Sequence, residues 1–402
     1  MKHLYLCLLA VTLIYGSVPS IRRAEAEPDP ARVILLIIDG LRWDAPQRLQ
    51  MTNLLALAGQ GAAIEKAWLV MPNHPVTGAW AELHTCSYPN PVLMAGTLFI
   101  TPQTRYLQHS FNRRQNTAHA ANCLAYLSLN RDYTYSMLKN APDAAAIDFT
   151  INLIESNPIS FMRIHLQNTG SAGYQCSRSK PDTPGYRDIW ADGSPYVKAA
   201  LEADRQLGRL MSALQASRKW DDTLLVITAD HGQADTGWHP TMAEDSWCAP
   251  LIFVGPGIRP CARLAEAEHI DVVPTICRLM DIEPPNNDAG AGRVLHEIMA
   301  VPPDNVTPAS AMPVTRAINQ TIKEYMLLRS EMLLRAAQAD PHLENAVMLA
   351  DRRFYGIDRL LDWHKAGSPD KLLQTNRKIL KQLQAALEDS QKNREKDETG
   401  TE

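Results

Sequence analysis

The chain has 402 residues, of which 45% are hydrophobic and 21% are charged, and its formal net charge is −4. This length fits two or three domains or one large α/β domain, and the apolar content suffices for a substantial core. Because basic residues are not in excess, the composition excludes nucleic acid as an expected partner.

The first 26 residues predict a secretory signal peptide. Lys2 gives a basic start, a short apolar run follows, and Ala24 and Ala26 form an Ala-x-Ala cleavage site. The run is shorter than the roughly 20 residues that a membrane span needs, and an uncleaved anchor is the alternative. We expect a secreted or periplasmic protein whose mature chain starts near Glu27 and has no transmembrane span.

The chain has seven cysteines, and six remain once Cys7 is removed with the signal peptide. An even number in an exported chain allows disulfides. Cys248 and Cys261 are the nearest pair in the sequence, and only this spacing favours them as partners.

Apolar β-branched runs alternate with helical patterns from residue 32 to residue 280. The run 33–38 has no polar alternation, as expected for a strand buried on both faces of a parallel sheet. Residues 71–91 are rich in Pro, Gly and Asn and predict a loop, with a helix starting at Pro91. Further strands are predicted at 62–70, 159–167, 224–228 and 250–258, and helices at 46–60, 195–217 and 272–280. The pattern predicts an α/β domain over residues 27–300, with a mostly parallel central sheet and helices on both faces.

The composition changes after residue 300. Residues 301–313 read as a Pro-rich linker, and residues 314–388 as appended helices. We expect these helices to pack on the main domain or on each other; a partner-binding coil is the alternative. Residues 389–402 are charged and predict a disordered tail. Two apolar stripes define the helices: Ile318, Ile322, Met326 and Leu333, and then Leu372, Ile379, Leu383 and Leu387.

Two of the predicted buried strands end on carboxylates. Asp39 follows the first strand, and Asp230 follows the strand 224–228 and is itself followed by His231. Ligands of open α/β sheets bind beyond the carboxyl ends of the strands. Carboxylate oxygen and imidazole nitrogen are ligands of divalent ions, so Asp39, Asp230 and His231 predict a metal site. A helix N-cap is the alternative for a single such aspartate.

Four segments carry a resemblance to a known family: "VILLIIDGLRWD", "LLVITADHG", "PLIFVGPGI" and "HIDVVPTICRLMDIEPP". In their order and spacing they resemble successive blocks of the alkaline phosphatase superfamily. Its members include sulfatases and type I phosphodiesterase/nucleotide pyrophosphatases. The resemblance covers about residues 32–298 and leaves the C-terminal helices outside. It implies a metal that polarises a phosphoryl or sulfuryl oxygen and lowers the pKa of a bound nucleophile.

That nucleophile is implied to be a Thr, Ser or modified Cys before a helix whose N-terminal amides hold the anionic group. The segment 84–97, "HTCSYPNPVLMAGT", resembles this arrangement. Ser87 has a proline two positions on, as the families have, whereas the family spacing counted back from the glycine gives Cys86. Thr85 is a third alternative. We favour Ser87, then Cys86, and a polar turn without a catalytic role is the remaining reading.

Two further features bear on the nucleophile. Cys86 lacks the arginine of the Cys-x-Pro-x-Arg pattern of sulfatase maturation, since Asn90 stands there; we assign Asn90 to substrate binding. The segment 71–78, "MPNHPVTG", resembles a phosphodiesterase block, but it would put Val70 at the nucleophile position, where valine cannot act. Thr77 remains an alternative.

The resemblance implies a second metal only in members with extra Asp and His ligands. Here the corresponding loop has Gln167 and Asn168, and amides are poor zinc ligands beside a carboxylate. We therefore expect one divalent ion (zinc, manganese or calcium), with His239 as a possible further ligand. His165, inside an apolar strand, is interpreted as a core residue.

These features predict an exported metal-dependent hydrolase of small phosphate or sulfate esters that uses a metal-activated side-chain nucleophile. Two alternatives remain open. One is a degenerate, non-catalytic member that binds a ligand or partner, because second-site ligands are missing. The other is a transferase that passes a phospho-headgroup to an acceptor other than water.

Overall fold

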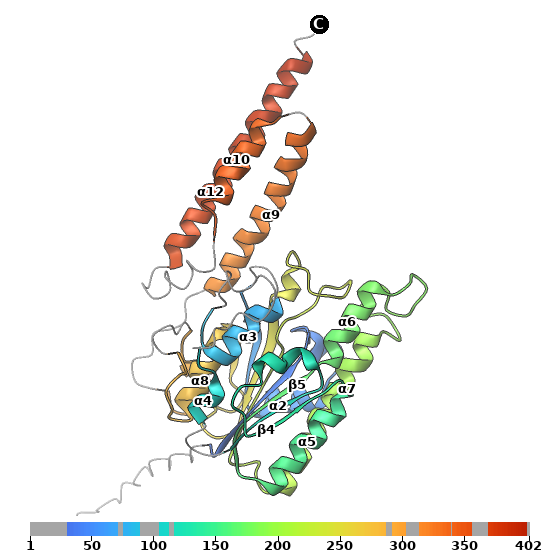
Figure 1. The fold of residues 1–402 in the computed structure, drawn as a ribbon, viewed down its shortest axis with the longest axis vertical. Helices are drawn as coiled ribbons and strands as arrows, with labels where there is room; N and C mark the ends of the chain where they lie inside the picture. The colour runs from blue at the N-terminus through green and yellow to red at the C-terminus, as the bar shows by residue number, and fades with distance from the viewer. Residues whose placement is uncertain are drawn as a thin grey trace, which may run out of the picture.

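The computed structural model describes most of the chain after residue 29 (Figure 1). The described residues are 30–70, 75–88, 104–111, 116–286, 292–302, 313–338, 340–355 and 369–399. The predicted signal peptide, Asn90 and most of the predicted linker lie outside them.

An eight-stranded sheet forms the centre of the molecule, in the order β4-β3-β5-β1-β6-β7-β2-β8. All neighbouring pairs are parallel except those of β7, which runs antiparallel to β6 and β2. The mostly parallel sheet predicted from the sequence is confirmed. Its strands are β1 (Arg32–Ile38), β2 (Ala62–Trp68), β3 (Asn116–Ala121), β4 (Tyr135–Leu138), β5 (Ile159–Leu166), β6 (Thr223–Thr228), β7 (Cys248–Val254) and β8 (Arg263–Glu268).

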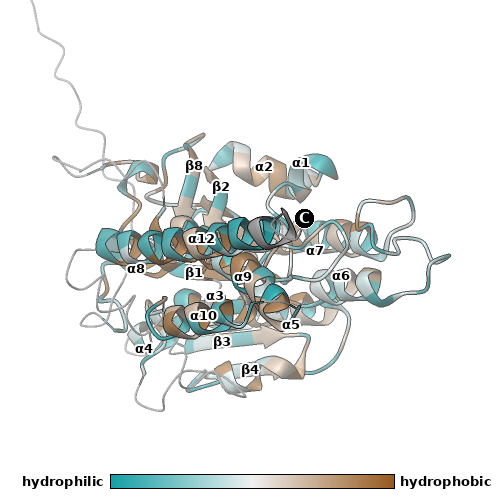
Figure 2. Ribbon diagram, turned by 90° about the horizontal axis from the view of Figure 1, so that it is seen from above, coloured by the Kyte–Doolittle hydropathy of each residue, from teal (hydrophilic) through white to brown (hydrophobic). Residues whose placement is uncertain are grey.

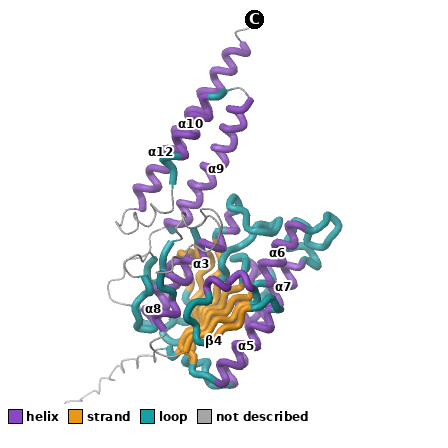
Figure 3. The backbone as a smooth tube through the Cα atoms, in the orientation of Figure 1, coloured by secondary structure: helices purple, strands orange, loops and turns teal. Residues whose placement is uncertain are grey.

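Helices cover both faces of the sheet (Figure 3). The side chains of β1 alternate between two apolar clusters: Val33, Leu35 and Ile37 enter one, while Ile34, Leu36 and Ile38 enter the other. The first cluster includes residues of α3, α4 and α8, and the second those of α2, α5 and α7. This double burial explains why β1 lacks polar alternation. The helices are α1 (Ala45–Arg48), α2 (Thr52–Gln60), α3 (Pro75–Thr85), α4 (Leu107–Phe111), α5 (Asp143–Ser156), α6 (Asn168–Arg178), α7 (Pro195–Ala216) and α8 (Val272–Leu279).

In the described part of the C-terminal region, helices α9 (Val314–Gln338), α10 (His342–Asp351) and α12 (Pro369–Thr399) project from the α/β body (Figure 1). They pack mainly on each other, through an apolar cluster that includes Tyr325, Val347 and Leu383. Polar and apolar residues alternate around them (Figure 2). A second cluster joins Ile318 and Leu372 to Val70 and Ile270 of the body. Within the described ranges, no helix is both long and apolar enough to cross a membrane.

Two segments differ from their sequence predictions. Residues 75–85 form helix α3 inside the stretch predicted as loop, because Ala79 and Leu83 of this segment pack into the core. Residues 389–399, predicted as disordered, continue α12. Their Lys, Arg and Glu residues are good helix formers, and the helix is already nucleated by its packed N-terminal half.

None of the six cysteines after residue 26, all of which lie in the described ranges, forms a disulfide, so the structure contradicts a Cys248–Cys261 disulfide. Cys248 is buried in β7, whereas Cys261 is exposed and its thiol donates to the Gly59 carbonyl.

Candidate metal centre

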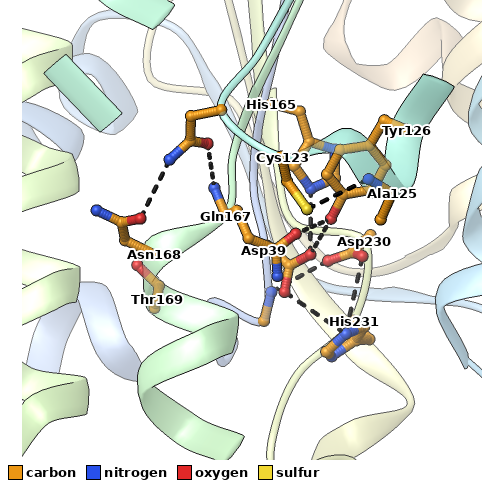
Figure 4. A network of polar contacts seen from close by, with 12 residues as sticks. Asp39, Cys123, Ala125, Tyr126, His165, Gln167, Asn168, Thr169, Asp230 and His231 are labelled. Atoms are coloured by element: carbon orange, nitrogen blue, oxygen red, sulfur yellow. Dashed lines mark hydrogen bonds and ion pairs between the residues drawn. The ribbon is translucent and has the colours of Figure 1, made fainter. Parts of the chain in front are cut away.

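Three neighbouring parallel strands bring polar side chains together at the centre of the sheet. The order β5-β1-β6 places His165 on β5, Asp39 directly after β1 and Asp230 two residues after β6 (Figure 4). Each of these three residues offers a ligand atom, and the three atoms lie within 4.8 Å of one another. The carboxyl ends of the strands therefore meet in a buried cluster of the kind that the sequence predicted, with one unexpected member.

Asp39 is held mainly through one of its two oxygens. Its Oδ2 accepts a hydrogen bond from the Tyr126 hydroxyl at 2.5 Å and lies 3.2 Å from His165 Nε2. The Tyr126 ring stacks on the His165 imidazole with centroids 3.8 Å apart. Gln167 also hydrogen-bonds to the Asp39 carboxyl group. These contacts leave Oδ1 turned toward His231 and the backbone of Gly170, where a Cβ would lie only 1.6 Å from Oδ1.

The tautomer of His231 is fixed by its own loop. His231 Nδ1 lies 2.7 Å from the carbonyl oxygen of Gly232, to which only an N–H can bond. The lone pair of a neutral His231 is therefore on Nε2. This atom lies 3.9 Å from Asp39 Oδ1 and 3.7 Å from Asp230 Oδ2. Ligand atoms arranged tetrahedrally at about 2.1 Å from a metal are about 3.4 Å apart, close to these separations.

Asp230 supplies an oxygen without a partner. Its Oδ1 accepts a hydrogen bond from the Gly40 amide at 3.0 Å, whereas Oδ2 is buried and has no hydrogen-bond partner in the described structure. The Asp39 and Asp230 carboxyl groups also interact directly. Burial raises the pKa of both, and the charge of Asp39 raises the pKa of Asp230 further. Two such carboxylates need a shared proton or a cation, so the residues present fit a divalent ion.

Arg163 sits beside this cluster without a carboxylate in direct contact within the described chain. It is fully buried and donates to three imidazoles: from Nε to His84 Nε2 at 2.5 Å, from Nη1 to His119 Nε2 at 2.5 Å, and from Nη2 to His165 Nδ1 at 2.9 Å. Because arginine has only donors, each of these nitrogens must be an acceptor. His165 therefore carries its proton on Nε2 and donates it to Asp39.

This tautomer distinguishes the roles of the two histidines near Asp39. His231 presents a lone pair toward the carboxylates, whereas His165 presents a hydrogen that orients one of them. The sequence interpretation of His165 as a core residue was incomplete, because the side chain is buried but also contacts Asp39. The sequence did not point to four further residues of this network: Tyr126, Arg163, His84 and His119. The one available signal was Arg163, a positively charged residue inside the apolar strand β5.

Burial, followed by the charge of Arg163, holds the pKa of His119 well below 6.5. A histidine that is neutral when folded but protonated when unfolded contributes stability above its unfolded pKa, and this stability is lost as the pH falls below that value. The amide of His119→Gln can accept from Arg163 and donate to Asn130. We expect this variant to lose less of its free energy of unfolding than the wild type as the pH falls. Between about pH 6 and pH 5 the free energy of unfolding should fall about 1.4 kcal/mol less than in the wild type. Urea titrations at each pH measure this difference, and parallel curves would contradict it.

His239 lies next to the cluster rather than in it. Its ring stands edge-on to that of His231, with centroids 4.3 Å apart, and packs on Trp238 at 3.9 Å. Gln233 connects the loop that carries Trp238 and His239 to the residues around Asp39. Its Oε1 accepts from the Trp238 amide, and its side chain fills the space beside Gly40 and Gly173. The loop and α6 are thereby fixed relative to Asp39.

Comparison with known proteins agrees with this architecture. The model of the family described as Sulfatase matches residues 97–282, which include Asp230 and His231. A phosphonate monoester hydrolase from Silicibacter pomeroyi superposes with a TM-score of 0.53 at 18% identity, over 69% of this chain and 78% of that one. The family model and the shared fold together place the chain with the alkaline phosphatase superfamily.

Two curated relatives match parts of the chain. A 2,3-bisphosphoglycerate-independent phosphoglycerate mutase from Nitrosococcus oceani is 30% identical over 36% of this chain and 25% of its own length. The bis(5'-adenosyl)-triphosphatase enpp4 from Xenopus laevis is 26% identical over 50% of this chain and 47% of its own. The chain thus spans less than half the length of these relatives.

The predicted nucleophiles Cys86 and Ser87 lie after a helix, and the helix predicted to start at Pro91 lies outside the described residues. Cys86 and Ser87 follow the C-terminal end of α3, and Ser87 Oγ donates to the Thr85 carbonyl at 3.1 Å. Cys86 is packed in the core, and burial raises the pKa of its thiol to about 12, the opposite of activation. Burial therefore works against activation of Cys86, whose role as a nucleophile stays a prediction. Ser87 stays a prediction, as does Asn90, which lies outside the described residues.

The strand-loop-helix arrangement implied by the resemblance occurs earlier, between β2 and α3. Val70 stands after this strand, is fully buried and contributes to an apolar cluster with Ile270 and Ile318. This position corresponds to the second alignment considered from the sequence, in which valine replaces the nucleophile. The side chain of Thr77 lies outside the described part.

Proposed function

We propose that the chain is a metal-dependent esterase in which Asp39, Asp230 and His231 hold one divalent ion that binds the phosphoryl or sulfuryl group of a small ester. The observation that carries the proposal is the approach of His231 Nε2 to both carboxylates, at 3.9 Å from Asp39 Oδ1 and 3.7 Å from Asp230 Oδ2. His231 Nδ1 and Asp230 Oδ1 make the supporting hydrogen bonds of these two side chains, and Asp230 Oδ2 has no hydrogen-bond partner in the described structure. Lone pairs in this arrangement repel one another unless a cation lies between them.

A bound divalent ion would polarise an ester oxygen and offset the charge that develops on it. The residues around the site prepare its ligands. Tyr126 and His165 both donate to Asp39 Oδ2, which favours the ionised form of Asp39 and orients its carboxylate. The Gly40 amide does the same for Asp230 Oδ1.

We propose one ion rather than two. The candidates for a second site are engaged elsewhere: Gln167 contacts the Tyr126 hydroxyl, and Asn168 accepts from the Asn122 side chain at 3.1 Å. The mixed oxygen and nitrogen donors suit zinc or manganese, and calcium only with added oxygen ligands. His239, whose ring contacts those of His231 and Trp238, is the candidate for a further ligand.

Phosphate and sulfate esters are both open as substrates. The matching family model is named for sulfatases, whereas the two curated relatives are named for reactions of phosphate compounds. Turnover of p-nitrophenyl phosphate, bis-p-nitrophenyl phosphate and p-nitrophenyl sulfate by metal-loaded protein tests the proposal. We expect metal-dependent release of p-nitrophenol from at least one of them. The apolar start of the chain supports a secreted or periplasmic location for this activity.

A degenerate member that binds its ligand without turning it over is the second candidate. The buried Val70, which follows β2 and has no nucleophilic group, favours it, as does the burial that raises the pKa of the Cys86 thiol. Stoichiometric metal binding and measurable binding of inorganic phosphate, without turnover of any of the three esters, would support this candidate. Turnover that requires Ser87 would exclude it.

A further inference from the structure

A second recognition surface adjoins the metal centre. A cavity of about 670 Å³ lies between α6 and the loop that follows His231. Its wall has two aromatic rings, those of Tyr174 and Trp238, whose centroids are 4.5 Å apart. Two ring contacts connect this wall to the centre: Trp238 packs on His239, and His239 on His231. The side chains that line the cavity include Tyr174, Arg178, Arg187 and Trp238.

The cavity is positively charged. Arg178 Nε donates to the Tyr174 hydroxyl at 3.0 Å, which directs its guanidinium along this wall, and Arg187 lines the same cavity. No carboxylate in the described part of the chain lies within ion-pair distance of either guanidinium. By contrast, nearby Arg42 pairs with Asp44, Asp235 and Asp245. Two arginines without acidic partners beside an aromatic wall are suited to an anion attached to a ring.

The backbone around the cavity is strained. Trp238 has φ 69° and Arg187 has φ 51°, both in the left-handed region that bulky residues rarely adopt. Gln233 Oε1 accepts from the Trp238 amide at 3.0 Å and holds this conformation. The preceding position requires glycine, because a Cβ on Gly237 would lie 2.3 Å from the Gly173 carbonyl oxygen. Strain of this kind is concentrated at sites of function.

We propose that this cavity binds the non-reacting part of the substrate, which carries a ring and a second anionic group. Trp238 and Tyr174 would contact the ring, and Arg178 and Arg187 the second anion, while the reacting group lies at the metal centre. The inference rests on the proposed function for the placement of the reacting group. Nucleoside bisphosphates and sugar bisphosphates share this chemistry, so the experiment separates an aromatic base from a saccharide ring.

The test measures binding rather than turnover. Full-length, manganese-loaded protein is titrated calorimetrically with inorganic phosphate and with two pairs of probes: AMP and adenosine 3',5'-bisphosphate, and glucose 1-phosphate and glucose 1,6-bisphosphate. We expect the bisphosphate of at least one pair to bind about tenfold more tightly than its monophosphate. The pair that shows the difference identifies the kind of ring.

The variant Arg178→Gln/Arg187→Gln should remove this difference and leave binding of inorganic phosphate unchanged. Trp238→Ala should weaken both ring-bearing probes of that pair, and Arg335→Gln on α9 is the matched control. An unchanged preference in the double variant would overturn the cavity assignment and leave the metal centre intact. Failure of inorganic phosphate itself to bind, with manganese bound, would count against the proposed function, whereas a bisphosphate preference lost in the double variant would still support the cavity.

Discussion

Asp230→Asn is expected to abolish tight metal binding and at the same time to stabilise the metal-free protein. The amide keeps the oxygen that accepts from Gly40 but replaces the unpartnered Oδ2 by an N–H group, which cannot bind a cation. We expect affinity for the divalent ion to fall at least about 100-fold, more than a loss of a supporting hydrogen bond would cause.

The gain in stability follows from the raised pKa of Asp230. A carboxyl group whose folded pKa is raised contributes stability at low pH that is lost as the pH rises through the folded pKa. In EDTA, the free energy of unfolding of Asp230→Asn should therefore exceed that of the wild type by about 1–3 kcal/mol at pH 8, and by less at pH 5. Asp188→Asn, at an exposed position, should change neither property. A variant that still binds the metal, or that is less stable in EDTA, would contradict this account.

Removal of Arg163 is expected to be the most destabilising single change near the centre. Arg163→Met leaves the acceptor nitrogens of His84, His119 and His165 buried without donors. Each buried unsatisfied acceptor costs about 1–3 kcal/mol, so a loss of about 3–5 kcal/mol or more is expected in chemical denaturation.

Arg163→Lys separates charge from geometry. Lysine keeps the cation but lacks the planar fork that reaches three acceptors, so its stability should fall between the wild type and Arg163→Met. Metal affinity should fall about 10–100-fold in Arg163→Met, because His165 would no longer be fixed as a donor to Asp39. Exposed Arg205→Met is the control. A loss under 1 kcal/mol in Arg163→Met would show that the three contacts do not support the site.

The sequence predicted the central strands and the meeting of Asp39 with Asp230 for a common physical reason. A strand buried on both faces is continuously apolar, so the carboxylates at the ends of β1 and β6 stand out, and parallel topology brings such ends together. Asp39 and Asp230 therefore meet in the structure as expected, and His231 faces both.

The supporting residues could not be predicted in this way. Tyr126 belongs to the short segment after β3, and its contact with Asp39 spans 87 positions in the sequence. The role of His165 depends on which of its nitrogens accepts from Arg163, and no spacing rule reveals a tautomer. Helix α3 formed where Pro, Gly and Asn predicted a loop because core burial outweighed local propensity.

The most direct test of the metal centre is elemental analysis of three proteins after loading with excess divalent metal and dialysis: the wild type, His231→Gln and His165→Gln. A site built on Asp39, Asp230 and His231 predicts close to one equivalent per chain in the wild type and none in His231→Gln. His165→Gln, which removes a donor to Asp39 rather than a ligand, should bind more weakly but still reach one equivalent when the metal is kept saturating. The assignment would be contradicted if the wild type bound no metal or two equivalents. It would also be contradicted if His231→Gln were fully occupied and His165→Gln bound none.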